Sequence, residues 1–388
     1  MNIFDNNIKD CYGCGVCATA CPHSVIGIEL NKSGFYEPIA ANPDRCTNCG
    51  LCMKACAFAH DKLSLKKPQI KSYGAWSNNP EVRKKCSSGG VGFELGRALI
   101  DEGYKVCAVR YNVEANRAEH YVASTVEELE ASVGSKYIQS YTVDGFKAAN
   151  RRQKHLVIGT PCQIDSLRRY ISIAKQEENF VLVDFFCHGV PSKLLWDKYT
   201  KWAEKQTGRI SHVSWRNKNA GWHESWDMSI RGNEGEIHSR LSQGDMFYRL
   251  FLSDTCLGKA CYEKCKYKYA HSAADIRLGD AWGFHYADDE KGVSCAIAFT
   301  EKGDKVLHRT SCTLEEMPFD TVCEWQMKKC AHKPRFNRKM MAMLKNDALG
   351  IEEILNDTES FLRWQKMKGR LLNPHRTLKN ILKRLKKK

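Results

Sequence analysis

The N-terminal fold is decided by residues 11–21, CYGCGVCATAC, and residues 46–56, CTNCGLCMKAC. Both stretches have the cysteine spacing CxxCxxCxxxC, and the second copy begins 35 residues after the first. Gaps of two residues allow three thiolates of one loop to bind three irons of a cubane, while the fourth cysteine reaches the other cluster. The repeat therefore predicts a bacterial-type ferredoxin domain with two [4Fe–4S] clusters over residues 1–60.

In this pattern each cluster takes three cysteines from one copy and the last cysteine of the other copy. The predicted ligands of the first cluster are Cys11, Cys14, Cys17 and Cys56, and those of the second are Cys46, Cys49, Cys52 and Cys21. Zinc is the alternative, but tetrahedral zinc sites want paired CxxC knuckles, which these runs fit poorly. Pro22 follows the first run, whereas Ala57 stands where a proline often follows the second. Because proline is not a ligand, this departure leaves the prediction unchanged.

The whole chain has 388 residues, which is enough for two to three domains and a large core. The part after the ferredoxin segment is expected to be a catalytic or redox-active body that uses the electrons. The 19 cysteines, together with oxygen-sensitive clusters, indicate a reducing compartment and no disulfides. The N-terminus lacks the features of a signal peptide and no stretch has eighteen apolar residues, so we expect a cytoplasmic protein without a membrane span.

The net charge of +15 belongs mainly to the C-terminus. Residues 363–388 contain eleven Lys or Arg and no acid, which leaves +4 for residues 1–362. After Pro374, Leu and Ile recur at helical spacing among basic residues, and we expect residues 336–388 to form a helical basic tail. Such a tail can lie peripherally on the inner face of a membrane or bind a partner, or it can be solvated with one stripe packed on its own domain. No nucleic-acid motif accompanies the charge, so nucleic acid is not an expected partner.

The body is expected to begin after a linker over residues 61–83, which are polar and contain Lys, Pro and Asn. The turn Ser87-Ser88-Gly89-Gly90 then leads into a helical stretch, VGFELGRALIDEG, and a strand-like stretch, KVCAVRY. A Ser/Gly turn that opens a helix offers N–H groups and hydroxyls to a phosphate. By itself this signal is weak, because many helices simply begin with serine.

Two later segments, HLVIGTPCQIDSLRRY and FVLVDFFCHGVPSKLLWDKYTKW, have the layout of strand, loop and helix. They place Cys162 and Cys187 just after the strands. If the strands are parallel, both cysteines lie at the carboxyl edge of one sheet, where open α/β sheets bind cofactors. The alternative for either cysteine is a small buried hydrophobic residue. The segments SHVSWRN, SWDMSIRG and GEIHSRL predict antiparallel strands added to the α/β core.

The loop CLGKACYEKC contains Cys256, Cys261 and Cys265. Three cysteines so close together predict a metal site that takes a fourth ligand from elsewhere. Cys162 is the predicted fourth ligand, and Cys187 is the reserve. We favour a third [4Fe–4S] cluster, with structural zinc as the rival. The cysteines without ligand spacing are expected to be structural: Cys86, Cys107, Cys295, Cys312, Cys323 and Cys330.

The order of these motifs, from Cys11 to about Phe284, resembles the coenzyme F420 hydrogenase/dehydrogenase beta-subunit family, in the branch with an N-terminal two-cluster ferredoxin. The motifs that carry the resemblance are Ser87-Ser88-Gly89-Gly90, Gly134-Ser135-Lys136-Tyr137, Gly159-Thr160-Pro161-Cys162-Gln163, Cys187-His188-Gly189, the Cys256 to Cys265 loop, and Ala274-Asp275-Ile276-Arg277-Leu278-Gly279-Asp280. One departure is the gap of three residues between Cys261 and Cys265, where the family often has two.

The resemblance implies an α/β body that holds a flavin, expected to be FAD, and a [4Fe–4S] cluster, and that exchanges hydride with F420 or another organic partner. It implies that Ser88, Gly89 and Gly90 approach the flavin phosphates, that Lys136 lies near the isoalloxazine or the substrate, and that Cys162 binds iron with the loop cysteines. Ser87 and Thr160 are further candidates for cofactor binding. Residues 84–160 are accordingly expected as the flavin-binding region, and residues 161–335 as the region of the third cluster.

A flavin exchanges hydride and also passes single electrons, so the expected function is an oxidoreductase that couples the two through the clusters to a redox partner protein. Lys136 is the candidate for stabilising charge on the reduced flavin or an anionic substrate; its alternative is a surface lysine. His188 is the candidate proton relay, or else a hydrogen-bond donor to a cluster ligand. Two alternatives remain: a ferredoxin-fed flavin reductase that does not use F420, and a non-catalytic electron-transfer subunit of a partner enzyme.

Overall fold

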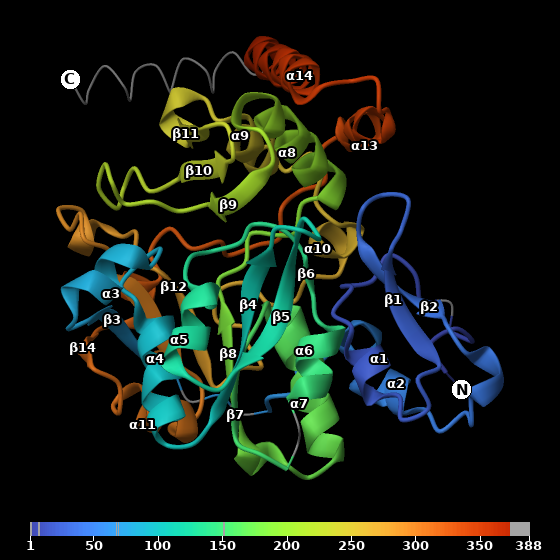
Figure 1. The fold of residues 1–388 in the computed structure, drawn as a ribbon, viewed down its shortest axis with the longest axis vertical. Coiled ribbons are helices and arrows are strands. Elements are labelled where there is room, and N and C mark those ends of the chain that lie inside the picture. Colours follow the sequence, from blue (N-terminus) through green and yellow to red (C-terminus); the bar gives the residue numbers. More distant parts are fainter. Residues whose placement is uncertain (1, 7, 67, 69, 150–151, 373–388) are drawn as a thin grey trace.

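The computed structural model describes residues 2–372, except residues 7, 67, 69, 150 and 151. The ferredoxin-like domain lies at one side of a larger body built around a mixed sheet (Figure 1). In this domain, strand β1 (Ile26–Leu30) pairs antiparallel with β2 (Tyr36–Ala40), and the short helices are α1 (Val16–Ala20) and α2 (Leu51–Ala55). Gly15 and Gly50 precede the two helices with φ values of 71° and 74°. Glycine tolerates this left-handed backbone, which starts each helix directly after the cysteine loop.

The body contains a nine-stranded sheet with the order β14-β3-β13-β12-β8-β7-β4-β5-β6. The strands are β3 (Lys71–Ser77), β4 (Lys105–Asn112), β5 (Arg117–Ala123), β6 (Ser140–Tyr141), β7 (His155–Ile158), β8 (Phe180–Phe185), β12 (Ile276–Asp280), β13 (Ser294–Ala298) and β14 (Cys312–Glu316). The central strands β12, β8, β7 and β4 are parallel neighbours. The flanking pairs are antiparallel, except that the edge strand β6 is parallel to β5. The strands before Cys162 and Cys187, β7 and β8, are parallel, so the condition for placing both cysteines at one sheet edge is met.

The linker expected over residues 61–83 is wrong for its second half. Residues 71–77 form β3, which lies between β13 and β14, and helix α3 (Pro80–Lys85) follows. The side chain of Asn79 caps α3 by accepting hydrogen bonds from the Glu81 and Val82 N–H groups. The body thus begins before the Ser/Gly turn, and β3 forms part of its sheet.

Both faces of the sheet are covered. Successive residues of a strand point to opposite faces, and in the central strands the residues on both faces are buried. In β8, Val181 and Val183 pack in one apolar cluster and Leu182 packs in another. The helices that contribute to the first face are α3, α4 (Val91–Asp101), α5 (Val126–Leu129) and α11 (Glu301–Leu307). The second face is covered by α6 (Val143–Ala148) and α7 (Pro161–Ile173). Helices α1 and α2 pack on α7, which joins the ferredoxin-like domain to the sheet.

Helix α7 begins where strand β7 has just ended. Gln163 Oε1 accepts a hydrogen bond of 2.8 Å from the Thr160 N–H, in a capping box, and Pro161 occupies the first turn. The Gln163 side chain satisfies a backbone N–H at the start of the helix, and Pro161 fixes the backbone φ angle of the first turn. Cys162 is consequently fixed in the first turn of α7, at the carboxyl edge of the sheet.

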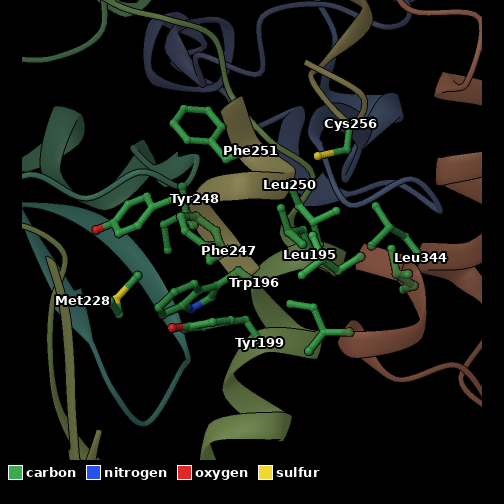
Figure 2. Packing of buried hydrophobic residues seen from close by; sticks show 14 of the residues in the cluster. Leu195, Trp196, Tyr199, Met228, Phe247, Tyr248, Leu250, Phe251, Cys256 and Leu344 are labelled. Atoms are coloured by element: carbon green, nitrogen blue, oxygen red, sulfur yellow. The ribbon is translucent and has the colours of Figure 1, made fainter. Parts of the chain in front are cut away.

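A second layer packs above the sheet edge and has its own core (Figure 2). It consists of a three-stranded antiparallel sheet and helices: β9 (Ile210–Ser214), β10 (Asp227–Gly232), β11 (Glu236–Arg240), α8 (Lys193–Thr207), α9 (Met246–Leu252), α13 (Asn337–Lys345) and α14 (Ile351–Leu372). The predicted antiparallel strands exist, but they form this separate sheet and do not extend the α/β sheet. Trp196, Tyr199 and Phe247 are fully buried in the core, at roughly 2–3 kcal/mol of hydrophobic stabilisation each.

The remaining helices are short: α10 (Lys259–Glu263), α12 (Phe319–Val322) and the 3-10 turns Pro43–Arg45, Ala57–Ala59, Glu130–Ser132, Glu177–Asn179, Leu241–Gln243 and Phe284–Tyr286. Within the described residues, no helix combines the length and the hydropathy of a membrane span. The predicted amphipathic helix after Pro374 lies outside the described residues.

Candidate functional site

The eight N-terminal cysteines surround two small hollows, four at each. The first hollow is lined by Cys11, Cys14, Cys17 and Cys56, and the second by Cys21, Cys46, Cys49 and Cys52. These are the two crossed groups expected from the repeated spacing. We call them the inner group and the outer group, because the first lies against the body and the second contains the exposed Cys49.

The chemistry of the inner group fits an iron–sulfur cluster. Burial and nearby thiols raise the pKa of Cys11 to about 12 and that of Cys56 to about 11. Ionising several such thiols in one hollow is costly unless a cation compensates their charge, and the iron of a cluster supplies that compensation. Among the described residues, no three His, Cys, Asp or Glu side chains form a compact site for a single metal ion.

The inner group is tied to the body through helix α7. Ser166 Oγ accepts hydrogen bonds from Cys14 Sγ, at 3.3 Å, and from the Ala57 N–H, at 3.1 Å. Because Ser166 lies one turn after Cys162 on α7, one helix contacts the inner group and carries a body cysteine. The ferredoxin-like domain is therefore held in a defined position beside the sheet edge.

An aromatic side chain also lies at this junction. The Tyr12 hydroxyl donates a hydrogen bond of 2.5 Å to the Lys264 carbonyl, and its ring packs edge-on against Phe58 and Tyr267, at centroid distances of 5.2 and 5.7 Å. Burial raises the pKa of Tyr12, and the thiols of Cys162 and Cys265 add to the rise. Tyr12 thus lies between the inner group and the cysteines of the body.

Four body cysteines are near enough to raise one another's pKa, and we call them the third group: Cys162, Cys187, Cys261 and Cys265. Burial raises the pKa of Cys162 well above its ordinary value, and the neighbouring Cys187 and Cys261 contribute. Burial also raises the pKa of Cys261 to about 12, with contributions from Cys187 and Cys265. Cys187 follows β8, just as Cys162 follows β7, so two ligand candidates come from the carboxyl edge and two from the α10 loop.

Cys256 does not join this group, contrary to the predicted quartet. Its side chain is fully buried in the apolar core around Leu195 and Leu250, as Figure 2 shows. Burial raises its pKa to about 12, and the charged neighbour that contributes is Asp254, not another thiol. The thiol of Cys256 therefore lies in the core, and Cys187, which was the reserve ligand, is the thiol that neighbours Cys162, Cys261 and Cys265.

A buried cation lies beside the third group. Lys268 Nζ donates hydrogen bonds to the carbonyls of Cys187, at 2.5 Å, and His188, at 3.0 Å. Its positive charge lowers the pKa of Cys187, against the larger effect of burial. Cys330, which was expected to be structural, donates from Sγ to the Cys265 carbonyl at 3.0 Å. Sequence reasoning missed both residues, because neither has a recognisable spacing from the other cysteines.

Two predicted site residues lie beside the third group. Thr160 Oγ1 is 3.2 Å from Cys162 Sγ. The His188 ring hydrogen-bonds through Nε2 to Asp254 at 2.7 Å and packs edge-on against Phe251. His188 is thus held by a carboxylate next to the thiols, which suits either of its two expected roles.

The Ser/Gly turn lies at the same sheet edge, further along it. Ser88 Oγ donates to the Val293 carbonyl at 2.8 Å, and the Gly89 N–H donates to Ser294 Oγ at 3.0 Å. A Cβ on Gly89 would lie 2.3 Å from the Ala75 carbonyl oxygen, so only glycine allows this close packing. Part of the hydrogen-bonding capacity expected for phosphate is therefore used to hold the turn on β13 and β3.

The Ser/Gly turn and the Gly134 to Tyr137 motif meet in space. Ser87 Oγ accepts hydrogen bonds from the Ser135 N–H at 2.9 Å and from the Ser135 hydroxyl at 3.1 Å. Lys136 Nζ donates to the carbonyls of Ser132, Val133 and Gly134, at 2.8 to 3.0 Å. Burial lowers the pKa of Lys136 to about 7.

A second lysine at this turn was not predicted. Lys218 Nζ donates to the carbonyls of Arg83, Ser88 and Lys291, and burial lowers its pKa to about 8. In the described part of the chain, neither Lys218 nor Lys136 forms an ion pair with a carboxylate. Two buried lysines, neither of them in an ion pair with a described residue, flank the turn, and their charge favours an anionic cofactor or substrate there.

Arg216 connects the turn to the central strands. It lies 3.3 Å from Asp280 in an ion pair, donates 3.0 Å to the Tyr137 hydroxyl, and donates 3.2 Å to the Ser87 carbonyl. Its guanidinium also lies over the rings of Trp226 and Trp282. The sequence showed Asp280 at the end of the last family motif but gave no signal for Arg216, whose role depends on the fold.

Comparison with protein families identifies three matching segments. Residues 10–59 match the family described as 4Fe-4S dicluster domain. Residues 72–145 match coenzyme F420 hydrogenase/dehydrogenase, beta subunit N-term, and residues 152–320 match the C terminus of the same subunit. The chain belongs to the coenzyme F420 hydrogenase/dehydrogenase beta-subunit family. The resemblance read from the order of motifs, including the ferredoxin branch, is confirmed, and this beta-subunit family member carries an N-terminal dicluster domain.

This family member was also compared with solved structures and with curated proteins. Among solved structures, it is similar to a chain of the F420-reducing [NiFe] hydrogenase complex from Methanosarcina barkeri, studied by xenon derivatization. The identity is 16%, the match covers 78% of this chain and 94% of that chain, and the TM-score is 0.45. A search of curated proteins found no match.

Proposed function

We propose that this beta-subunit family member is an iron–sulfur flavoprotein oxidoreductase that exchanges hydride with coenzyme F420 or a similar organic substrate and passes electrons singly to a redox partner. A bound FAD would supply the conversion between hydride and single electrons, and three [4Fe–4S] clusters would supply one-electron transfer. The family match supports the F420 side of the proposal, and the matched dicluster domain supports the electron-transfer side.

The observation that carries the proposal is the order of groups along the sheet edge. The Ser/Gly turn with its two cations lies at one end, and the third group of thiols follows at the ends of β7 and β8. The inner group adjoins the third group through α7 and Tyr12, and the outer group reaches the surface at Cys49. A protein that only held clusters would not need a row of groups that begins at a buried, positively charged site and ends at an exposed thiol.

Each group of residues has a proposed task in this function. Ser87, Ser88, Gly89 and Gly90 would hold the flavin, with Lys136 and Lys218 providing positive charge. Charge from fixed cations in a buried site stabilises an anion that develops during reduction. The proposed ligands of the third cluster are Cys162, Cys187, Cys261 and Cys265. His188, held by Asp254, is the proposed proton relay or support of a cluster ligand.

A second candidate is a non-catalytic electron-transfer subunit. One observation favours it: the Ser88 hydroxyl, the Gly89 N–H and the Lys136 ammonium already have partners within the chain. Such a subunit would need the clusters and a docking face, but no flavin.

Iron and released flavin, counted per chain on protein purified without oxygen, separate the two candidates. The oxidoreductase requires about twelve irons and about one flavin, since three clusters contain four irons each. About eight irons without flavin would contradict it and leave a ferredoxin-like carrier. About twelve irons without flavin would support the third cluster and favour the electron-transfer subunit.

A further inference from the structure

Helix α14 leaves the body part-way along its length. Its first half is anchored: Ile351, Ile354 and Thr358 are buried, and the Phe361 ring stacks on Phe336 at 4.7 Å. From residue 362 to residue 372 the helix continues for roughly 16 Å at 1.5 Å per residue. Figure 1 shows this end of α14 at the outer margin of the molecule, beyond the layer of α8 and α9.

The projecting half carries a stripe of large apolar side chains. Trp364, Met367 and Leu371 are 51%, 58% and 80% exposed. Their spacing of three and four residues places them within an arc of about 60° on the helix. This arc differs from the side of the helix that packs on the body, so the stripe does not simply continue the buried face. A soluble surface rarely concentrates such residues without a binding role.

Basic residues accompany the stripe, and this part of the sequence contains no acidic residue. Arg363 and Lys366 are exposed, and Lys368 Nζ lies 5.1 Å from the centre of the Trp364 ring. From residue 360 to the C-terminus the sequence contains no Asp or Glu, whereas residues 363–388 contain eleven Lys or Arg. The surface therefore combines a tryptophan-containing apolar stripe with uncompensated positive charge.

We propose that the projecting half of α14, residues 362–372, binds the surface of an anionic lipid bilayer. A tryptophan ring suits the boundary between head groups and acyl chains, and Met and Leu enter the hydrocarbon. Arg363 and Lys368, at the edges of the stripe, reach the phosphates, since such side chains bury their stems and keep their charge in the polar layer; Lys366 adds charge further round the helix. A protein partner would need acidic complementarity to this charge, and a second copy of the chain would bring like charges together.

Sedimentation of the full-length holoprotein with lipid vesicles tests this proposal. We expect binding to vesicles that contain phosphatidylglycerol, and at least about tenfold weaker binding to pure phosphatidylcholine. Replacing the stripe in one variant, Trp364→Ser with Met367→Ser and Leu371→Ser, should weaken binding by about tenfold or more. Charge reversal, Arg363→Glu with Lys366→Glu and Lys368→Glu, should do the same.

The matched control removes an exposed aromatic pair elsewhere on the surface. Phe284 and Trp325 are 72% and 64% exposed, so Phe284→Ser with Trp325→Ser removes a similar apolar area away from α14. This variant should bind vesicles as the wild type does. Iron and flavin content should be unchanged in all variants, which separates this test from that of the proposed function.

Three outcomes would overturn the proposal. The first is equal binding of the wild type to anionic and neutral vesicles, or to neither. The second is unchanged binding of the stripe variant, which would leave the charge of the remaining tail as the whole cause. The third is a wild type that is a dimer in sedimentation equilibrium and a stripe variant that is a monomer without any vesicle binding, which would identify a second copy as the occupant.

Discussion

At the scale of single residues, Cys187 and Cys256 show how tertiary structure separates two candidate ligands. Cys256 is nearer to Cys261 in sequence, but its thiol is buried among the apolar side chains of the second layer. Cys187 comes from a distant strand end and lies beside Cys162, Cys261 and Cys265. Burial raises the pKa of both thiols, but Cys187 has other thiols around it, whereas the charged neighbour of Cys256 is Asp254.

Substituting each of these two cysteines should separate their roles. We expect Cys187→Ala to lose about four of about twelve irons per chain, because one cluster has four irons. Cys256→Ala should keep the iron and lose about 1 kcal/mol of unfolding free energy through a small cavity. Iron analysis and denaturant unfolding check both. Loss of iron from Cys256→Ala together with full iron in Cys187→Ala would contradict the assignment.

Lys136 gives a prediction about pH. Burial lowers its pKa from the usual 10.5 to about 7, so the side chain is charged at pH 6 and neutral at pH 9. Its attraction for an anionic cofactor is therefore present below pH 7 and is lost as the pH rises through this value. We expect wild-type protein to release flavin more readily at pH 9 than at pH 6 in an ultrafiltration assay.

The control for this step is Lys136→Arg, because arginine keeps its charge over the whole range. This variant should show a weaker pH dependence, and the part that remains belongs to Lys218, whose pKa is about 8. Identical profiles for the wild type and Lys136→Arg would show that Lys136 does not act through its charge.

How much of the site could be predicted depends on how local its geometry is. The crossed groups of Cys11 to Cys56 follow from spacing within two short loops, and the structure brings the same four-cysteine groups together. Arg216, Lys218 and Lys268 act through contacts with residues far away in the chain, and no pattern of neighbours marks them. Charge compensation of this kind can be recognised only once the fold brings the groups together.

At the scale of elements, strand β3 shows why a strand was mistaken for a linker. Apart from the aromatic Tyr73 and Trp76, its residues, KSYGAWS, are small or polar, and they lack the alternation that predicts a half-buried strand. Gly74 is required by the Tyr286 hydroxyl, which would lie 1.8 Å from an added Cβ. The partners of β3 are β13 and β14, which come more than two hundred residues later. Its composition is set by close packing with these strands, which a local pattern does not reveal.

The start of α4 offers a test of this close packing. Gly89→Ala would place a Cβ 2.3 Å from the Ala75 carbonyl oxygen and 2.8 Å from the Ser294 nitrogen. Because backbone must move, we expect a loss of about 2–3 kcal/mol of unfolding free energy, together with lower flavin content.

Gly92, in the first turn of α4, is the matched position. A Cβ there would be 3.4 Å from Leu278 Cδ1, an ordinary contact, and alanine favours the helix. Gly92→Ala should therefore change the unfolding free energy by less than about 1 kcal/mol. Equal destabilisation by both substitutions in denaturant unfolding would argue against close packing as the reason for Gly89.

At the scale of the whole molecule, the three thiol groups predict a direction in space for electron transfer. The outer group is the one with an exposed cysteine, Cys49, so it is the expected contact for the redox partner. Cys49→Ala should lose about four irons and slow delivery of electrons to a ferredoxin acceptor by about tenfold or more. Reduction of the remaining centres by reduced F420 should persist in this variant, as followed by absorbance.

The control for this experiment is Cys312→Ala, which changes a half-buried cysteine on the edge strand β14. It should keep its iron and its rate of delivery. If Cys49→Ala delivered electrons as fast as the control, the outer group would not be the exit.

The hydrogen bond that holds the Ser/Gly turn on β13 also has a consequence for biosynthesis. The hydrogen bond from Gly89 to Ser294 joins positions 205 residues apart, so the Ser/Gly turn cannot be seated until the ribosome has released the chain well beyond β13. All eight ferredoxin cysteines, by contrast, lie within the first 56 residues and are made early. Because chains fold from the N-terminus as they are made, the N-terminal loops can meet the iron–sulfur assembly machinery while translation continues. The turn becomes available to a cofactor only after β13 has been made, so metal supply and flavin supply can act at different times in the life of each molecule.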